Sequence, residues 1–178
     1  MRIVGGEFKG RTLVEFKGEE IRPTSDKVRE SLFNILQNRI YGCRFLDLFC
    51  GTGAMGIEAL SRGAKEVTFN DASRKSLEIL NKNLEKIKVQ KGYKISNCDA
   101  ERFVASCSEP FDVIYIDPPY KSGLGIKALN SILPAISSDG IIVYEEEQQF
   151  EGEIKGLKVV DKRKYGRAHL TFFIKEEE

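Results

Sequence analysis

Residues 45–53 read FLDLFCGTG, a short apolar run that ends directly in a glycine-rich turn. Residues 45–49 suit a buried strand, and the glycines at 51 and 53 open a helix that we expect to reach about Arg62. A strand that feeds a helix through such a turn is the first unit of an α/β fold, in which ligands bind at the carboxyl ends of strands. The stretch therefore predicts both the fold class and the edge of the sheet that binds a ligand.

The alternation of strand and helix patterns continues to the C-terminus. The expected strands are residues 45–49, 66–70, 93–95, 111–116, 141–144, 157–161 and 168–174. Between them we expect a long helix capped by Ser73 or Asp71, a short one near Phe103, and one through residues 128–133. Near-continuous apolar strands predict a parallel sheet covered on both faces, and the tight turn between the last two strands makes one of them antiparallel. The fold class is thus a three-layer, Rossmann-like α/β sandwich with a mostly parallel seven-stranded sheet.

The first 43 residues precede this core. Glycines at 5, 6, 10 and 18 suit a short hairpin or an extended arm, and a helix follows that Thr24 or Ser25 caps and Gly42 stops. Residues 1–44 hold nine Lys or Arg against six Asp or Glu, an excess that favours an anionic partner. No repeat or linker divides the chain, so we expect one domain, with residues 1–43 as an N-terminal extension and 44–178 as the core.

The cysteines and the single histidine exclude the common metal sites. Cys43, Cys50, Cys98 and Cys107 form no C-x-x-C pair, and His169 is the only histidine, so we expect no metal and reduced thiols. The N-terminal sequence lacks the pattern of a signal peptide, and no run is apolar enough to span a bilayer. We therefore expect a cytoplasmic protein without a membrane partner.

The glycine turn and three acids point to a nucleoside-containing cofactor. G-x-G-x-x-G at residues 51–56, with Asp71 about 20 residues on, fits NAD or S-adenosylmethionine equally, because both carry a ribose. Asp47 favours S-adenosylmethionine, since a carboxylate suits its cationic amino-acid end but not a pyrophosphate. Asp99 follows the third strand, where it can accept a hydrogen bond from the adenine amino group. The cofactor-binding candidates are Asp47, Phe49, Gly51, Gly53, Asp71, Asp99 and Ala100.

The residues Asp117-Pro118-Pro119-Tyr120 end the fourth strand beside that turn. The exocyclic amine of a nucleobase is a poor nucleophile, because its lone pair is delocalised into the ring. The Asp117 carboxylate and the Pro118 carbonyl each accept one N–H bond, which aims the lone pair at a sulfonium methyl. The prolines fix that carbonyl, and Tyr120 stacks on the base. Residues 117–120 are the catalytic candidates, and their chemistry fits any base amine.

These motifs resemble the class I S-adenosylmethionine-dependent methyltransferases, and more narrowly the RsmD family of 16S rRNA (guanine-N2)-methyltransferases. Residues 2–6, 9–11, 22–24 and 28–36 are similar to the N-terminal signature of that family. The blocks at 45–53 and 117–120 also match, as does Lys164-Tyr165-Gly166 with the alternation that follows it. Family members often carry glutamate where this chain has Asp71, and the shorter acid should still reach the ribose.

The resemblance implies methylation of one guanine N2 in small-subunit rRNA, with an assembled or nearly assembled particle as the substrate. It also implies that basic residues of the extension hold rRNA phosphates. The RNA-binding candidates are Lys9, Arg11, Arg22 and Arg29. A monomer is expected.

Three other functions remain open from the residues alone. The first is an adenine-N6 or cytosine-N4 methyltransferase of DNA or RNA, which uses the same four-residue motif, although the chain shows no inserted target-recognition segment. The second is a non-catalytic cofactor-binding subunit, which the intact D-P-P-Y disfavours. The third is a dehydrogenase, for which nothing beyond His169 offers proton transfer. The acidic runs Glu145–Glu147 and Glu176–Glu178 suit solvated ends, although the first run is a candidate for the border of the active site.

Overall fold

The computed structural model describes residues 1–17 and 24–177. Within them the strands are β1 (Arg44–Asp47), β2 (Glu66–Asn70), β3 (Tyr93–Ser96), β4 (Phe111–Ile116), β5 (Ile136–Glu146), β6 (Leu157–Tyr165) and β7 (Ala168–Lys175). The helices are α1 (Asp26–Ile35), α2 (Gln37–Ile40), α3 (Ala54–Ser61), α4 (Arg74–Lys86), α5 (Ala100–Ala105), α6 (Leu124–Ser131) and the 3-10 turn η1 (Leu133–Ala135). Strands and helices alternate from β1 to β5, as the sequence predicts.

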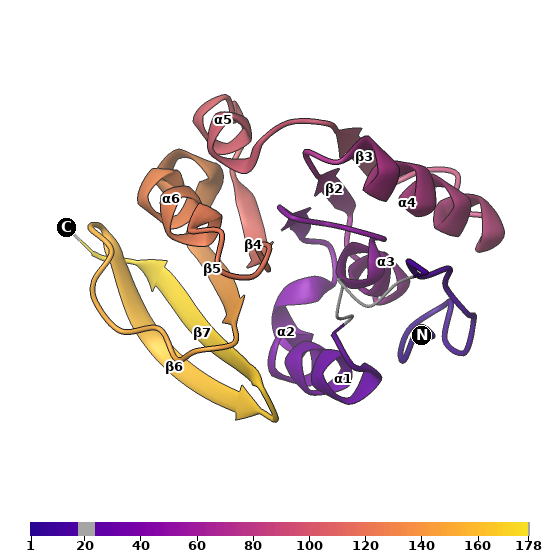
Figure 1. The fold of residues 1–178 in the computed structure, drawn as a ribbon, viewed down its shortest axis with the longest axis horizontal. Coiled ribbons are helices and arrows are strands. Elements are labelled where there is room, and N and C mark those ends of the chain that lie inside the picture. Colours follow the sequence, from indigo (N-terminus) through magenta and orange to yellow (C-terminus); the bar gives the residue numbers. More distant parts are fainter. Residues whose placement is uncertain (18–23, 178) are drawn as a thin grey trace.

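The seven strands form one sheet in the order β3-β2-β1-β4-β5-β7-β6 (Figure 1). Strands β1 to β5 pair in parallel, whereas β7 runs antiparallel to both β5 and β6. The predicted mostly parallel sheet with one antiparallel strand near the C-terminus is therefore confirmed. Since the order reverses at β1 and β4, the carboxyl ends of these two strands mark the point where such sheets bind ligands.

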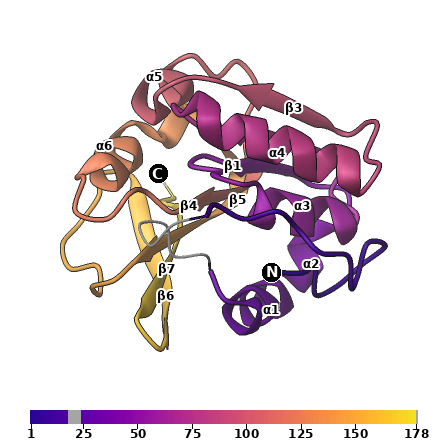
Figure 2. The ribbon, with the colours of Figure 1, turned by 45° about the vertical axis from the view of Figure 1, so that its right-hand side comes forward.

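Helices cover both faces of the sheet, and alternate strand residues feed two separate cores (Figure 2). On one face, Phe45 and Tyr115 pack with residues of α1, α2, α3 and α4. On the other face, Leu46 and Ile114 pack with α5, α6 and η1. Successive side chains of a strand point to opposite faces, so one strand supplies both layers of the sandwich.

Two strands differ from their predicted form. Strand β5 begins at Ile136 instead of Ile141, because the polar residues 137–139 continue the strand after a register shift opposite β4. Strand β3 lies at the sheet edge, and Ile95 is 36% exposed, so this strand is not covered on both faces. The strands at 66–70 and 111–116 match the prediction residue for residue.

The N-terminal extension forms a small hairpin followed by two helices. A single antiparallel bridge joins Arg2 to Thr12, and Ser25 caps α1 by accepting a hydrogen bond from the Val28 amide. The sequence predicts one helix up to Gly42, but α1 ends at Ile35. There the Arg39 amide donates to the Leu36 carbonyl, a three-residue step that starts the short α2.

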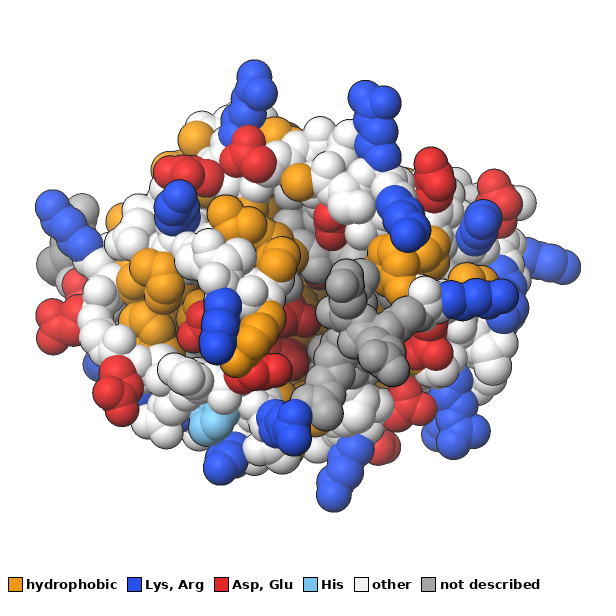
Figure 3. Space-filling model, in the orientation of Figure 1, with side chains coloured by type: hydrophobic (Ala, Val, Ile, Leu, Met, Phe, Trp, Pro, Cys, Tyr) orange, Lys and Arg blue, Asp and Glu red, His pale blue; other side chains and the backbone are white. Residues whose placement is uncertain are grey.

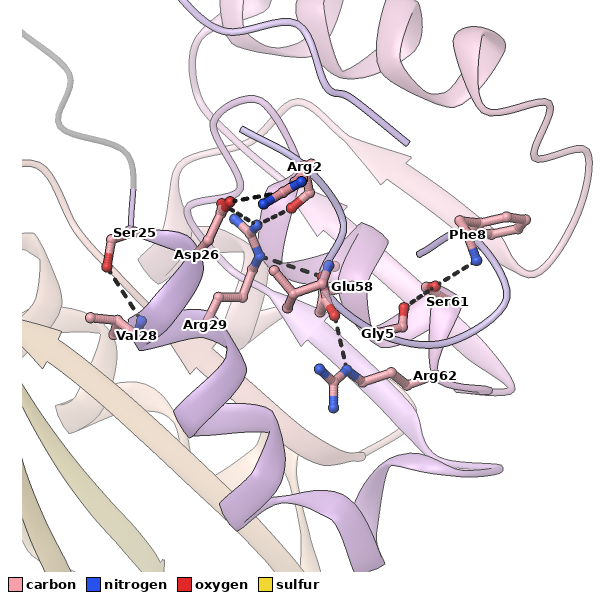
Figure 4. Close-up of polar contacts among 12 residues, drawn as sticks. Arg2, Gly5, Phe8, Ser25, Asp26, Val28, Arg29, Glu58, Ser61 and Arg62 are labelled. Carbon is pink, nitrogen blue, oxygen red and sulfur yellow. Dashed lines mark hydrogen bonds and ion pairs between the residues drawn. The ribbon is translucent and has the colours of Figure 1, made fainter. Parts of the chain in front are cut away.

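Arg29 holds the extension against the core instead of facing solvent (Figure 4). Its side chain is 0% exposed, and its guanidinium lies 2.8 Å from Asp26 Oδ1 and 3.4 Å from Glu58 Oε2. It also donates to the Arg2 carbonyl, while Glu58 accepts from the Val4 amide at 3.1 Å. The prediction that Arg29 contacts RNA phosphates is wrong, because a buried guanidinium that is already paired cannot reach a phosphate.

Candidate functional site

Three carboxylates meet at the carboxyl ends of neighbouring strands. Asp47 ends β1, Asp117 follows β4, and Glu145 lies near the end of β5. Asp47 pairs with Tyr115 across the sheet, so these acids lie on the sheet face that α1, α3 and α4 cover. The space-filling view shows acidic and apolar side chains together in the hollow at the middle of the molecule (Figure 3). No Lys or Arg of the described residues pairs with the three acids.

Asp47 is almost completely buried. Its Oδ2 accepts a hydrogen bond from the Gly56 amide at 3.0 Å, which fixes the carboxylate beneath the first turn of α3. Burial raises the pKa of Asp47 to about 7; the Gly56 hydrogen bond opposes this shift, and the nearby Asp71 adds to it. A carboxylate with so high a pKa gains strongly from a cationic ligand, because a positive charge restores its ionised form.

The glycine turn is tied to Asp71 at the end of β2. The Gly51 amide donates to Asp71 Oδ2 at 2.9 Å, and the Ser73 amide donates to Oδ1 at 2.8 Å. Gly51 has a φ of 53°, and a Cβ at this position would meet no atom within 4 Å. Gly53 differs, because a Cβ there would lie 2.3 Å from Leu80 Cδ1. Gly51 thus has open space for a ligand, whereas Gly53 is required for packing against α4.

The remaining cofactor candidates surround the start of α5. Asp99 caps α5, since its Oδ1 accepts from the Arg102 amide at 3.0 Å, and the residue is exposed. Ala100 is buried in the first turn, and Phe49 packs beside the second core. Asn97 holds this loop against β2 by donating to the Asp71 carbonyl at 2.9 Å. The capping role uses one oxygen of Asp99 and leaves the other free.

The turn at residues 117–120 presents its carboxylate inward and its ring outward. Burial raises the pKa of Asp117 well above its usual range, and the charges of Glu145 and Asp47 add to the shift. The Tyr120 side chain is 62% exposed, and only Lys121 lies over its ring, with Nζ 5.0 Å from the centroid. Behind the turn, a Cβ on Gly125 would lie 2.7 Å from Pro118 Cγ, so that glycine lets α6 support the prolines.

Sequence reasoning missed two residues of this site and gave only a hint of a third. Tyr115 donates a hydrogen bond from its hydroxyl to Glu145 Oε2, and Thr24 Oγ1 lies 3.4 Å from the same hydroxyl. Burial raises the pKa of Glu145, so this residue is not a solvated strand end. The signal for Tyr115 was its position two residues before Asp117, which places both side chains on one face of a strand.

The basic residues of the extension that were predicted to bind RNA differ in where they lie. Lys9 and Arg11 are exposed at the hairpin, and Arg11 Nη1 donates to the Ile87 carbonyl at the end of α4 at 2.7 Å. Arg22 lies outside the described residues. Lys86 Nζ donates to Thr12 Oγ1 at 2.8 Å, so the hairpin is docked on the C-terminal end of α4.

The described residues contain neither a metal-binding cluster nor a membrane-spanning helix. Within residues 1–17 and 24–177, no cluster of His, Cys, Asp and Glu side chains suits a metal ion. Cys43, Cys50, Cys98 and Cys107 are all free thiols. None of the helices in the described part of the chain has the length and apolar character required to cross a bilayer.

Comparison with known proteins gives consistent matches over nearly the whole chain. The family model described as "Conserved hypothetical protein 95" matches residues 1–174. Ribosomal RNA small subunit methyltransferase D of Escherichia coli (strain K12) is 35% identical, over 90% of this chain and 79% of its own length. A Bacillus subtilis protein proposed as an rRNA methyltransferase, YlbH, is 36% identical over 98% and 99% of the two chains. A solved Escherichia coli structure, proposed as the methyltransferase yhhF, superimposes with a TM-score of 0.86 at 28% identity and covers 100% and 99% of the two chains.

Proposed function

This chain belongs to the RsmD family, whose model carries the description conserved hypothetical protein 95, and we therefore propose that it methylates the exocyclic N2 of one guanine in 16S rRNA. The methyl donor in this proposal is S-adenosylmethionine. The observation that carries the proposal is the turn at residues 117–120, which lies beside Asp47 and the open Gly51 loop. A base amine and a sulfonium cofactor bound there would meet at the ends of β1 and β4.

The residues present fit a cationic cofactor. The buried Asp47 lacks a cationic partner among the described residues, and its raised pKa makes a positive ligand group favourable. Asp71 is partly exposed and keeps lone pairs free for ribose hydroxyls, while the free oxygen of Asp99 suits the adenine amino group. When bound, the cofactor supplies an electrophilic methyl group on a positively charged sulfur. Phe49, Gly53 and Ala100 shape the pocket around these contacts.

The 117–120 turn prepares the amine for attack. Asp117 and the Pro118 carbonyl each accept one N–H of the amine, and Tyr120 stacks on the base. After the methyl group was transferred to it, the amine nitrogen would carry an additional proton. Asp117 accepts that proton at a carboxylate oxygen, which the nearby negative charges of Glu145 and Asp47 favour. The methylated base leaves neutral, and the proton passes to solvent.

The rRNA partner would be held on the side of the extension. Lys9 and Arg11 are exposed on the hairpin, and Arg22 precedes α1. These side chains supply the positive charge for contacts with the phosphate backbone of the rRNA.

The test measures transfer of labelled methyl groups to three substrates in parallel. These are small ribosomal subunits that lack the modification, naked 16S rRNA and duplex DNA, with nucleosides identified by mass spectrometry. We expect label in N2-methylguanosine from the small subunit or its rRNA. Label in N6-methyladenine of DNA would replace the proposal with the adenine enzyme. Absence of any transfer, despite measurable cofactor binding, would contradict it.

A further inference from the structure

Asp117 and Glu145 leave the sheet next to each other. Ile116 on β4 lies opposite Tyr144 on β5 in a parallel register, so the two residues that follow are neighbours across the strands. Tyr115 lies two residues before Asp117, on the same face, and its hydroxyl donates to Glu145 Oε2. Two carboxylates on adjacent strand ends thus face one space.

The Glu145 side chain is held in one orientation. Tyr115 engages Oε2, and Thr24 at the start of α1 lies 3.4 Å from the same tyrosine hydroxyl. The Thr24 side chain also hydrogen-bonds the Glu145 carboxylate, and among the described residues no Lys or Arg forms an ion pair with it. A carboxylate offers about four acceptor positions, so these two hydroxyl groups leave room for an N–H of a ligand. The strand register places the Glu145 carboxylate next to Asp117, where the target base would lie.

The edge of the base next to its amino group distinguishes guanine from other amino-bearing bases. In guanine, the ring nitrogen N1 beside the N2 amine carries a hydrogen, so the edge presents adjacent donors. In adenine and cytosine, the ring nitrogen beside the amine is an acceptor, which a carboxylate repels. Two neighbouring carboxylates therefore match guanine alone, because one accepts from N2–H and the other from N1–H.

We propose that Glu145 selects guanine, accepting the N1–H of the target base while Asp117 accepts from the N2 amine. Tyr115 is its positioning residue. This inference rests on the proposed function, and it assigns the choice of base to a residue outside the 117–120 motif. Asp117 then performs the step common to amine methylation, and Glu145 decides which base undergoes it. Desolvation raises the pKa of Glu145, and the hydrogen bonds from Tyr115 and Thr24 oppose this shift.

The first test is Glu145→Gln, compared with Glu147→Gln as a matched control in the same acidic run. Glu147 is exposed and outside the site, so its variant should transfer methyl groups at the wild-type rate. In Glu145→Gln, Tyr115 donates to the amide oxygen, and the amide N–H groups then oppose guanine N1–H. We expect kcat/KM for N2-methylguanosine formation in the small subunit to fall about 100-fold. The Tm of Glu145→Gln should match that of the wild type. Its cofactor affinity, measured by calorimetry, should stay within about 3-fold of the wild-type value.

The second test replaces the guanine that the wild type methylates with 2-aminopurine, in an rRNA fragment or subunit joined by ligation. This base keeps the 2-amino group, but its N1 is an acceptor and it lacks O6. The wild type should prefer guanine by about 100-fold, and Glu145→Gln should reduce that preference at least about tenfold, because its amide donates to N1. Loss of O6 affects both enzymes equally and cancels in the ratio.

The outcomes separate this inference from the proposed function. If the wild type forms no N2-methylguanosine, the proposed function fails. If the wild type forms it and Glu145→Gln keeps both its rate and its preference for guanine over 2-aminopurine, the proposed function stands and the role of Glu145 is wrong. An equal loss of activity on both bases would make Glu145 a general support of the site, which also overturns its role in selection.

Discussion

In the proposed mechanism, Asp117 is the residue on which methyl transfer depends most directly. Replacing it with Ala removes the acceptor for one N–H of the amine and the base that takes its proton. We expect turnover to fall about a thousandfold, within the range typical of positioned acid–base groups. The calorimetric affinity for S-adenosylmethionine should persist, because Asp47 and Asp71 hold that ligand. Loss of cofactor binding in Asp117→Ala would show that its assigned role is wrong.

Asp47 gives a prediction about stability and pH. Its pKa is about 7 in the folded protein, above the ordinary carboxyl value, so the folded state binds the proton more tightly than the unfolded chain. The stabilisation from this proton is therefore complete at low pH and is lost as pH rises towards 7. In the absence of cofactor, Asp47→Asn should remove this part of the decline in Tm between pH 5 and pH 8. An unchanged pH profile of Tm would mean that Asp47 is ionised throughout.

At the scale of single elements, α6 illustrates how a helix supports the site. Gly125 has no Cβ, and one placed there would lie 2.6 Å from Tyr144 Cε2 and 2.7 Å from Pro118 Cγ. Gly125→Ala should therefore push α6 away from the prolines and destabilise the protein by about 1–3 kcal/mol. Turnover should fall more than cofactor affinity does. Lys127→Ala on the exposed side of α6 is the control and should change neither quantity.

The buried arginine of α1 leads to a second prediction at this scale. Arg29→Met leaves Glu58 with Arg62, at 2.9 Å, as its remaining ion-pair partner and removes the link to the Arg2 carbonyl. Breaking such a buried network costs about 3–5 kcal/mol, which denaturant unfolding would detect. The salt dependence of RNA binding should stay unchanged, because Arg29 does not reach solvent. A reduced salt slope would restore Arg29 to the RNA interface.

The elements of the core could be predicted from sequence more fully than their edges or the acidic site. Apolar runs bounded by glycines and caps defined β2 and β4 well, because periodicity and turn chemistry agree there. The early start of β5 could not be seen, because residues 137–139 are polar and lie in an irregular stretch between Ile136 and Ile141, which are the positions that pair with β4. Glu145 was only a candidate for the site border, since an acidic run at a strand end usually lies in water. Its position depends on Tyr115, which is 30 residues away in sequence.

Across the whole molecule, the negative charges of the site and the positive charges of the hairpin lie in different places. The acids of the site lack cationic partners among the described residues. The basic residues Lys9 and Arg11 lie instead on the hairpin, which contacts the end of α4 (Figure 2). A negatively charged site of this kind would attract a cationic cofactor and repel phosphates, so in the proposed complex the RNA backbone is held away from the site. In the proposed complex the extension provides that separate contact surface, and its docking by Arg29 and Arg11 fixes its distance from the site.

This division of charge predicts how binding responds to salt. Lys9→Ala combined with Arg11→Ala should weaken binding of small-subunit rRNA and reduce the slope of log affinity against log salt by about one to two. The matched control is Lys155→Ala with Lys158→Ala, two exposed lysines beside β6 on the opposite side of the molecule (Figure 1). The control should keep the wild-type slope, because β6 lies on the opposite side of the molecule from the hairpin (Figure 1). If both pairs change the slope equally, rRNA is attracted by overall charge and the extension is not a specific contact surface.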